Sequence, residues 1–405
     1  MDAKLDADVI VVGAGLAGAA LATSLARHGI RVLVLEREEV FRDRVRGEGM
    51  APWGVAEARA LGLAEVILAR CGQELGWTVS WDASVPTPER RRDLIATTAH
   101  RAGFFAFAYP DLQRVLLETA NAAGADVWQG ARVVSITPGR PPTVLVRRGE
   151  REATLRARFV VGADGRESRL RAWGGFAVER DPDRLFIASV LLRGGAAPRD
   201  AVRKVVNPPI GQAVLIVPLG QDRVRPYLMY RTLGARKGLS GAGRLDAFIQ
   251  TCLAVGSPPE WFAGAERDGP LAEFAGAHTW ATHPYRDGVA LIGDAAGTSD
   301  PSFGNGLSLS LRDARVLRDQ LLAHDDWDAA GHAYAAAHDQ YFGALRRLER
   351  WWTDLMHEVG SEAEALRARV FPRLKEEPDR APDLVGVGPD APSDEQARRR
   401  FFAEE

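Results

Sequence analysis

The most constraining feature of the sequence is a glycine-rich turn between a short apolar strand and a helix, close to the N-terminus. Residues 8–12 have the character of a buried strand, and residues 16–28 that of a helix of small residues. A second, β-branched strand follows at 30–35 and ends at Glu36. Such a βαβ unit requires a parallel sheet, because a helix carries the chain back between two strands of the same direction. The expected fold class is therefore α/β.

The turn carries the spacing G-x-G-x-x-G, which in this context is typical of a dinucleotide site. Its first glycine permits the tight turn, its second lets a pyrophosphate approach the backbone, and its third lets helix and strand pack closely. The helix N-terminus then offers free N–H groups to the phosphates. The candidate contacts are Gly13, Gly15, Leu16, Ala17 and Gly18.

Glu36 ends the second strand, where a carboxylate can accept hydrogen bonds from the adenosine ribose. A carboxylate there disfavours a 2′-phosphate, so the turn suits FAD or NAD rather than NADP, and by itself it does not decide between the two. Arg37 follows as a further candidate contact. A glycine-rich turn without a ligand is the alternative.

Composition excludes several classes. The 405 residues have a formal net charge of −2, which gives no bulk attraction to nucleic acid. Two cysteines cannot build a disulfide framework or a metal cluster, and no metal site is expected. The small-residue run 9–26 is interrupted by glycines and lacks a basic leader, so we expect neither a signal peptide nor a membrane span. The expected location is the cytoplasm.

Two later motifs decide between the cofactors by resemblance. Residues 159–171 contain Asp164-Gly165, and residues 289–296 contain Gly293-Asp294. These segments resemble the DG and GD motifs of the class A flavoprotein monooxygenases, the aromatic hydroxylases typified by p-hydroxybenzoate hydroxylase. The likeness covers roughly residues 8–325, and further positions keep family-like spacing: Ser168, Arg171, Pro301, Gly304, Gly306 and Asp313.

The resemblance implies a Rossmann-type, glutathione-reductase-like FAD domain interrupted by a substrate domain on a mostly antiparallel sheet, with a C-terminal helical region. Strand-like alternation at 184–192 and 213–230 agrees with this. Helices are expected at 110–123, 306–322 and 329–360, and a further one at 394–402 within an extended surface tail that begins at Glu376. The expected domains are 1–75, 103–180 and 282–325 for FAD, 76–102 and 181–281 for substrate, and 326–405 for the C-terminal helices and tail.

The resemblance also implies roles around a non-covalent FAD. Asp294 would accept hydrogen bonds from the ribityl chain, and Asp164 would hold the loop beside it, although a helix cap or a turn aspartate is the plain alternative. The helix after Pro301 would direct its dipole at the flavin pyrimidine. Gly304, Gly306 and Leu307 are the contacts expected there, with Gly293 beside Asp294, and Arg46 and Gln113 match family positions near the cofactor that could equally be solvent-exposed.

The implied reaction is hydroxylation of an aromatic or polyketide-like small molecule through a flavin hydroperoxide. Because no second nucleotide-binding turn exists, either NAD(P)H visits the flavin transiently or a partner reductase supplies reduced flavin. The DG motif favours NAD(P)H as a transient co-substrate, so no obligatory protein partner is expected. Pro301 is the candidate lining of the oxidation pocket. The base that activates a phenol stays open among His278, His283, Tyr227 and Tyr230, and the pocket aromatics, which could equally be core, are Trp77, Trp81, Phe104, Phe105 and Phe107.

Three departures from the motifs leave alternatives open: Gly297 after Ala295-Ala296, Ser308, and Tyr109. Gly297 and the Arg-Gly-Glu loop at 46–48 also resemble flavin-dependent halogenases and geranylgeranyl reductases. Halogenation is disfavoured, because the strand at 211–218 has no tryptophan and no lysine occurs between Lys4 and Lys204. A non-catalytic FAD-binding redox sensor is the alternative from another class.

Overall fold

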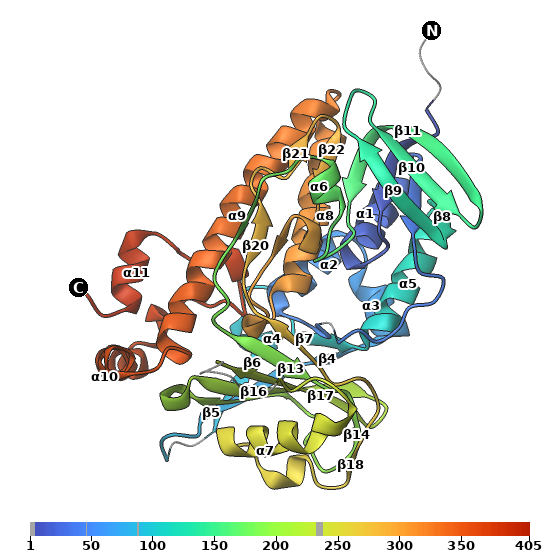
Figure 1. Ribbon diagram of the computed structural model, residues 1–405. Helices are drawn as coiled ribbons and strands as arrows, with labels where there is room; N and C mark the ends of the chain where they lie inside the picture. Colours follow the sequence, from blue (N-terminus) through green and yellow to red (C-terminus); the bar gives the residue numbers. More distant parts are fainter. Residues whose placement is uncertain (1–4, 46, 87–88, 232–237) are drawn as a thin grey trace.

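The computed structural model describes residues 5–45, 47–86, 89–231 and 238–405. It contains two large sheets with helices, one above the other in Figure 1, and a long helical arm beside both. Within these ranges, no helix combines the length and the apolar character needed to cross a membrane.

The first sheet contains the predicted βαβ unit. β1 pairs in parallel with β2, with Val9 opposite Val32, and also with β11. The strand order is β21-β22-β11-β1-β2-β8, and β9 and β10 form an antiparallel extension of β11. The strands are β1 Ala7–Val12, β2 Val32–Glu36, β8 Asp126–Gln129, β9 Ala131–Thr137, β10 Thr143–Arg148, β11 Arg151–Gly162, β21 Tyr285–Arg286 and β22 Val289–Leu291.

Helices α1, α5 and α8 pack together on one face of this sheet, because their small and aliphatic residues form one buried cluster with the strands. The β9–β10–β11 extension covers part of the other face. The prediction of an α/β fold with a parallel sheet is confirmed. The helices of this part are α1 Leu16–Arg27, α2 Pro52–Ala60, α3 Ala64–Arg70, α5 Tyr109–Ala122, α6 Leu170–Trp173 and α8 Gly306–Ala323.

The second sheet is antiparallel except for one pair, β15 with β5. One of its faces is covered by α7 Leu245–Val255. Its other face buries a smaller apolar cluster that includes β4 and β7 of the first part of the molecule. The strands are β5 Trp77–Asp82, β6 Arg90–Asp93, β13 Phe186–Ser189, β14 Leu192–Gly194, β15 Val202–Asn207, β16 Gln212–Gly220, β17 Arg223–Tyr230, β18 Ala265–Arg267 and β19 Ala272–Ala275.

Two small sheets and a short helix connect these layers. β4 and β3 both pair with β7, and β20 pairs with β12 and β23. The chain therefore passes into the second sheet after β4 and again after β12, close to the predicted interruptions; the domain limits themselves stay a prediction. The elements are β3 Gly49–Met50, β4 Gly72–Leu75, α4 Leu94–Thr97, β7 Phe104–Phe107, β12 Val178–Arg180, β20 Thr279–Ala281 and β23 Gly297–Thr298.

The C-terminal arm corrects one expectation. α9 Trp327–Met356 and α10 Ser361–Glu376 are followed by a tail that ends in α11 Glu395–Phe401. This tail is not an extended surface segment, because its apolar residues pack into a buried cluster with Trp53 and α9. The tail residues concerned are too widely spaced to show a periodicity in the sequence: Leu384, Ala391, Phe401 and Phe402.

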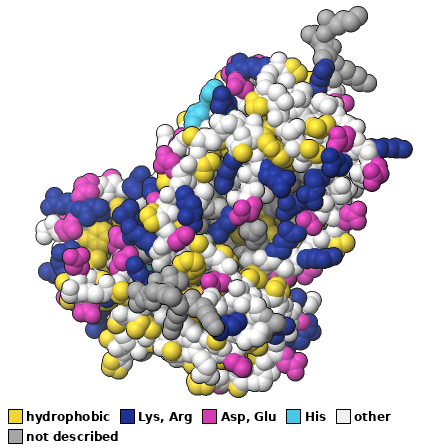
Figure 2. Space-filling view, viewed as in Figure 1, with side chains coloured by type: hydrophobic (Ala, Val, Ile, Leu, Met, Phe, Trp, Pro, Cys, Tyr) yellow, Lys and Arg dark blue, Asp and Glu magenta, His cyan; other side chains and the backbone are white. Residues whose placement is uncertain are grey.

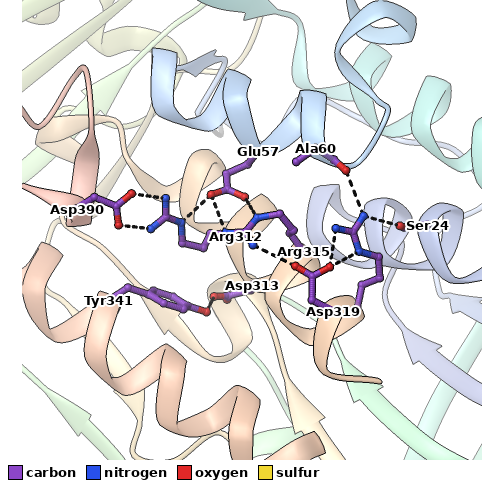
Figure 3. A network of polar contacts seen from close by, with 10 residues as sticks. Ser24, Glu57, Ala60, Arg312, Asp313, Arg315, Asp319, Tyr341 and Asp390 are labelled. Atoms are coloured by element: carbon purple, nitrogen blue, oxygen red, sulfur yellow. Dashed lines mark hydrogen bonds and ion pairs between the residues drawn. The ribbon is translucent and has the colours of Figure 1, made fainter. Parts of the chain in front are cut away.

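An arginine network fastens this tail to α8, as Figure 3 shows. Arg312 of α8 donates to both oxygens of Asp390 at 2.6 and 2.7 Å and to Glu57 of α2 at 2.7 Å. Arg315, one turn further on, also donates to Glu57. On the face visible in Figure 2, basic and acidic side chains are interspersed over both layers.

Candidate cofactor and oxidation site

The three glycines of the N-terminal turn differ in what surrounds them. Gly13 has φ +102°, and a Cβ there would lie 2.4 Å from the carbonyl oxygen of Ala163. A Cβ on Gly18 would lie 2.1 Å from the carbonyl oxygen of Gly13. A Cβ on Gly15 would meet only the Tyr109 hydroxyl, at 3.6 Å. The protein's own packing therefore requires glycine at 13 and 18, whereas the space at Gly15 is open to a ligand.

The start of α1 fits a phosphate group. Gly15 is its N-cap and contributes no side-chain hydrogen bond, so the first N–H groups, including those of Leu16 and Ala17, are uncapped. Such N–H groups, together with the helix dipole, bind anions. Gln113 is half-buried on α5, one turn after Tyr109, and therefore lies on the helix side whose tyrosine reaches Gly15.

Glu36 lies where the ribose contact is expected. Its side chain is buried at the end of β2, where one oxygen accepts from the Ala14 N–H at 2.7 Å and the other from the Glu38 N–H at 2.8 Å. Each carboxylate oxygen can accept a further bond, so both remain able to bind hydroxyls. Arg37 is exposed and pairs with Glu38 at 3.2 Å, so the structure gives it no specific place at the turn. Arg46 lies outside the described residues.

Asp164 follows β11 directly beside the glycine turn. Its Oδ2 accepts from the N–H groups of Arg169 and Leu170 at 2.8 and 3.3 Å, and therefore caps the short helix α6. Its Oδ1 is buried and has no protein partner among the described residues. A buried carboxylate oxygen without a donor is costly, so this atom fits a polar group supplied by the cofactor.

The Gly293-Asp294 turn is held from two sides. Gly293, at φ +60°, donates its N–H to Asp313 at 2.7 Å, and Asp313 in turn accepts from the Tyr341 hydroxyl at 2.5 Å. Arg171 donates to the carbonyl oxygens of Asp294 and Ala295. Asp294 lies in a 3-10 turn just after β22, and in the described part of the chain its carboxylate accepts no hydrogen bond. That carboxylate therefore remains available to ribityl hydroxyls.

A second glycine-containing segment, residues 299–306, precedes α8; we call it the glycine loop. Pro301–Phe303 forms a 3-10 turn, capped by Asp300 through the Ser302 N–H at 2.9 Å. Gly304 has φ +69°, and a Cβ there would meet nothing within 4 Å. A Cβ on Gly306 would meet only Ser299 Oγ, at 3.7 Å. The loop therefore leaves open space at the uncapped N-terminus of α8, as a flavin ring beside it requires.

Leu307, the second residue of α8, lies beside the segment that precedes β3: a Cβ on Gly47 would lie 3.7 Å from its side chain. In that same segment Glu48 is buried and forms an ion pair with Arg225 of β17 at 2.6 Å. Asp43 also accepts from Arg225, at 2.7 Å. This buried pair joins the cofactor layer to the second sheet. Glu48 belongs to the Arg-Gly-Glu loop that the sequence singles out, but nothing in the sequence indicated its pairing with Arg225.

Glu349 supports the glycine loop, although it lies on α9, more than 40 residues away in the chain. It is fully buried and accepts from Asn305 Nδ2 at 2.8 Å, from the Asp300 N–H at 3.2 Å and from His278 Nε2 at 2.7 Å. Because Asn305 is engaged with Glu349 and Trp53, it cannot cap α8. A glutamate within an aromatic helix gives no local signal of this role.

This network also determines the protonation of His278. Burial disfavours the imidazolium, but the hydrogen bonds with Asp181 and Glu349 outweigh it and raise the pKa of His278 to about 9. Burial raises the pKa of Asp300 to about 6. His278 is thus a charged structural residue rather than a free base.

Of the other three candidate bases, His283 and Tyr230 are engaged elsewhere. His283 contacts His332 at 2.8 Å on the outside of the first layer. Tyr230 donates to Glu273. Burial raises the pKa of Tyr227, which opposes a role as a proton acceptor. Of these, Tyr227 alone belongs to the apolar cluster between the layers.

Most of the candidate pocket aromatics lie elsewhere in the fold, and the alternative of a core role holds for Phe105 and Phe107. Trp77 is exposed beneath Arg91, and Trp81 packs on Trp261 beside α7. Phe105 and Phe107 belong to the core of the first layer. Phe104 is the member of the set that packs against the second sheet, because alternate residues of β7 point to opposite faces.

Residues 6–350 match the model of a family described as an FAD binding domain. The chain belongs to this family. It is 30% identical over 383 residues to 6-methylpretetramide 4-monooxygenase of Streptomyces rimosus, which spans 90% of this chain and 87% of that protein. It is also 31% identical to rifampicin monooxygenase of Streptomyces venezuelae, over 80% of this chain and 66% of that protein. Its identity to rifampicin monooxygenase of Rhodococcus hoagii is 30%, over 90% of this chain and 73% of that protein.

The fold is shared with solved flavoproteins. The flavin-dependent brominase Bmp2 superimposes with a TM-score of 0.78 at 18% identity, over 98% of both chains. PqsL of Pseudomonas aeruginosa, described as a probable FAD-dependent monooxygenase, superimposes with a TM-score of 0.71 at 22% identity, over 87% of this chain and 97% of its own. The predictions of the class A flavoprotein monooxygenase family, of FAD as cofactor and of an oxidoreductase are confirmed. The residue roles and the flavin hydroperoxide route stay predictions.

Proposed function

We propose that this flavoprotein hydroxylates an aromatic or polyketide-like small molecule, with NAD(P)H as reductant and O2 as oxidant. The relatives named above are two rifampicin monooxygenases and a 6-methylpretetramide 4-monooxygenase, which supports this substrate class. The chain spans only 66% of the length of the rifampicin monooxygenase of Streptomyces venezuelae.

The observation that carries the proposal is the contact between the glycine loop and the second sheet. A Cβ on Gly276 would lie 3.0 Å from Ile187 of β13 and 3.3 Å from Asp300 of the loop. The sheet face that includes Ile187 is lined by aliphatic and aromatic residues. An apolar face against a flavin edge is the arrangement that an oxygen-transferring site needs, because it places the substrate and keeps water out.

Different residues of the chain would then bind different parts of FAD. The uncapped start of α1 would hold the pyrophosphate, Glu36 the ribose, and Asp294 and Asp164 the ribityl region. Pro301 would shape the pocket beside the flavin without donating a proton. The N-terminus of α8 would stabilise negative charge on the reduced ring. FAD itself, when bound, supplies the redox chemistry that links NAD(P)H oxidation to activation of O2.

The test uses FAD-loaded protein with NADH or NADPH and a panel of phenols and polyhydroxylated polyketides. We expect at least one aromatic to accelerate NAD(P)H oxidation and to yield a product heavier by one oxygen atom. Alkene reduction without oxygen consumption, or a halogenated product in the presence of chloride or bromide, would contradict the proposal and support a reductase or a halogenase. FAD binding without any NAD(P)H oxidation would support a sensor.

A further inference from the structure

Lys204 is a cation on an otherwise apolar sheet face. It lies on β15, opposite Leu215 of β16 and Ser80 of β5. Because side chains alternate along a strand, it shares its face with Val202 and Val206, which both belong to the cluster between the two layers. The lysine therefore points to the side where the glycine loop lies, and its Nζ is 5.7 Å from the centre of the Phe303 ring.

The ammonium of Lys204 has neither a hydrogen bond nor an ion pair within the part of the chain that the structure describes. Asp300 acts on it only from beyond ion-pair distance, and one oxygen of Asp300 already accepts from Ser302. Burial lowers the pKa of Lys204, as expected for a cation with too little counter-charge. An anion that joined it would remove this penalty.

His357, at the C-terminal end of α9, brings an unused acceptor to the same place. Its ring is edge-on to Phe303, with 6.4 Å between the ring centres, and it is 1% exposed. Nδ1 lies 3.2 Å from the carbonyl oxygen of Gly211. Since a carbonyl oxygen can only accept, Nδ1 carries the proton and Nε2 is left as an acceptor. In the described structure Nε2 is buried without a partner.

The surrounding charges keep this imidazole neutral. Burial, and then the charge of Lys204, lower the pKa of His357 to about 3. Arg231 contributes in the same direction and pairs with Glu358 at 2.6 Å. Glu358 is also bound by Arg184 at 3.4 Å, so its carboxylate is committed away from Lys204. Among the described residues, a cation without a hydrogen bond or ion pair and a neutral acceptor without a donor thus both lie beside Phe303 of the glycine loop.

We propose that Lys204 and His357 form the polar end of the substrate pocket and select an acidic hydroxyaromatic substrate. The Lys204 ammonium would hold an anionic oxygen, either a phenolate or a carboxylate, while an adjacent hydroxyl donates to His357 Nε2. The apolar face beyond Lys204 would take the rings. This inference rests on the proposed function, since it assigns the substrate class of the same site.

The experiment follows binding alone, through the absorbance change of oxidised, FAD-loaded protein at pH 7.5. The probes are 3-hydroxy-2-naphthoate, its carboxamide and its methyl ether; 2-naphthol and 2-naphthoate distinguish a phenol from a carboxylate. The variants are Lys204→Met, Lys204→Arg and His357→Phe. Lys375→Met, at an exposed lysine of α10, is the matched control.

The wild-type protein and the Lys375→Met control are expected to bind the hydroxynaphthoate at least tenfold more tightly than its carboxamide, the size of one charge-assisted hydrogen bond. Lys204→Met should abolish this preference, and Lys204→Arg should retain part of it. His357→Phe should remove the preference for the free hydroxyl over the methyl ether and spare the preference for the anion.

Equal affinities of the wild-type protein for acid and amide, no binding of any acid, or a Lys204→Met variant that keeps the preference would overturn the inference. Failure of the proposed function gives a different result. Anion preference that depends on Lys204, but no oxygenated product with any substrate, would leave the recognition intact and remove the reaction. Hydroxylation with the same substrate selectivity in Lys204→Met as in the wild-type protein would leave the reaction intact and remove the recognition by Lys204.

Discussion

The two glycine-containing segments at the cofactor site are held in opposite ways. The turn at residues 13–18 is held by its own backbone, since carbonyl oxygens occupy the space where a Cβ of Gly13 or Gly18 would lie. The glycine loop at 299–306 has open space at Gly304 and Gly306. It is held by the buried carboxylate of Glu349, which accepts hydrogen bonds from Asn305 and the Asp300 N–H of the loop and from His278. One segment depends on local sterics, and the other on side chains distant in the sequence.

The largest effect should come from breaking the support of the glycine loop. Glu349→Ala leaves His278, Asn305 and the Asp300 N–H without their common acceptor, and removing one member of a buried charged pair costs about 3–5 kcal/mol. Urea unfolding of the apoprotein measures the loss. Glu349→Gln keeps the shape and one acceptor oxygen, and should cost less. Equal stability of Glu349→Ala and wild type would show that the network does not hold the loop.

The matched change in the other segment is Gly13→Ala. It should destabilise the apoprotein by about 2–4 kcal/mol, because the new Cβ must displace the backbone at Ala163 and because the alanine must keep the positive φ of this position. Gly15→Ala is the control: its Cβ meets only the Tyr109 hydroxyl, so stability should change by less than about 1 kcal/mol. The affinity for FAD should nevertheless fall at least tenfold. Calorimetric titration with FAD checks the last point, and unchanged affinity would place the pyrophosphate elsewhere.

The pH dependence distinguishes the segments further. The pKa of His278 is raised to about 9 in the folded protein, so its stabilising contribution is fully present below the unfolded value near 6.5. The contribution is lost as the pH rises toward 9 and amounts to about 3 kcal/mol at most. His278→Gln should flatten this part of the stability profile, measured by denaturant titration from pH 6 to 9.5. A profile as steep in the variant as in the wild type would contradict the assignment.

The smallest effect should come from the tail network of Figure 3. Asp390 is about half exposed, so Asp390→Asn should cost no more than about 1 kcal/mol, although Arg312 donates to both of its oxygens. Thermal unfolding checks this. A loss comparable to that of Glu349→Ala would mean that the tail supports α8 as strongly as α9 supports the loop.

The same contrast explains how much could be predicted from the sequence. The turn at Gly13, the carboxylate of Glu36 and the motif aspartates Asp164 and Asp294 are determined by short-range patterns, and the structure brings them together around the start of α1. Strand alternation likewise predicted the antiparallel second sheet.

The residues that sequence reasoning missed act across long chain separations. Glu349, Arg225 and His357 are polar residues whose partners lie many residues away, so no window of sequence reveals them. His278 and His283 were candidate bases because they lie on the strands expected for the substrate domain, and their partners in the fold give them other roles. The aromatic residues of β7 do not act as a group, because strand alternation sends Phe105 and Phe107 into the first core and Phe104 toward the second sheet.

The most direct test of the account is the source of oxygen in the product. FAD-loaded protein is supplied with NAD(P)H, the most stimulating hydroxyaromatic and ¹⁸O2, and the product is analysed by mass spectrometry. The account predicts one ¹⁸O atom per product molecule and one NAD(P)H oxidised for each. Product without ¹⁸O, or O2 consumption that yields only hydrogen peroxide with every aromatic tested, would contradict it.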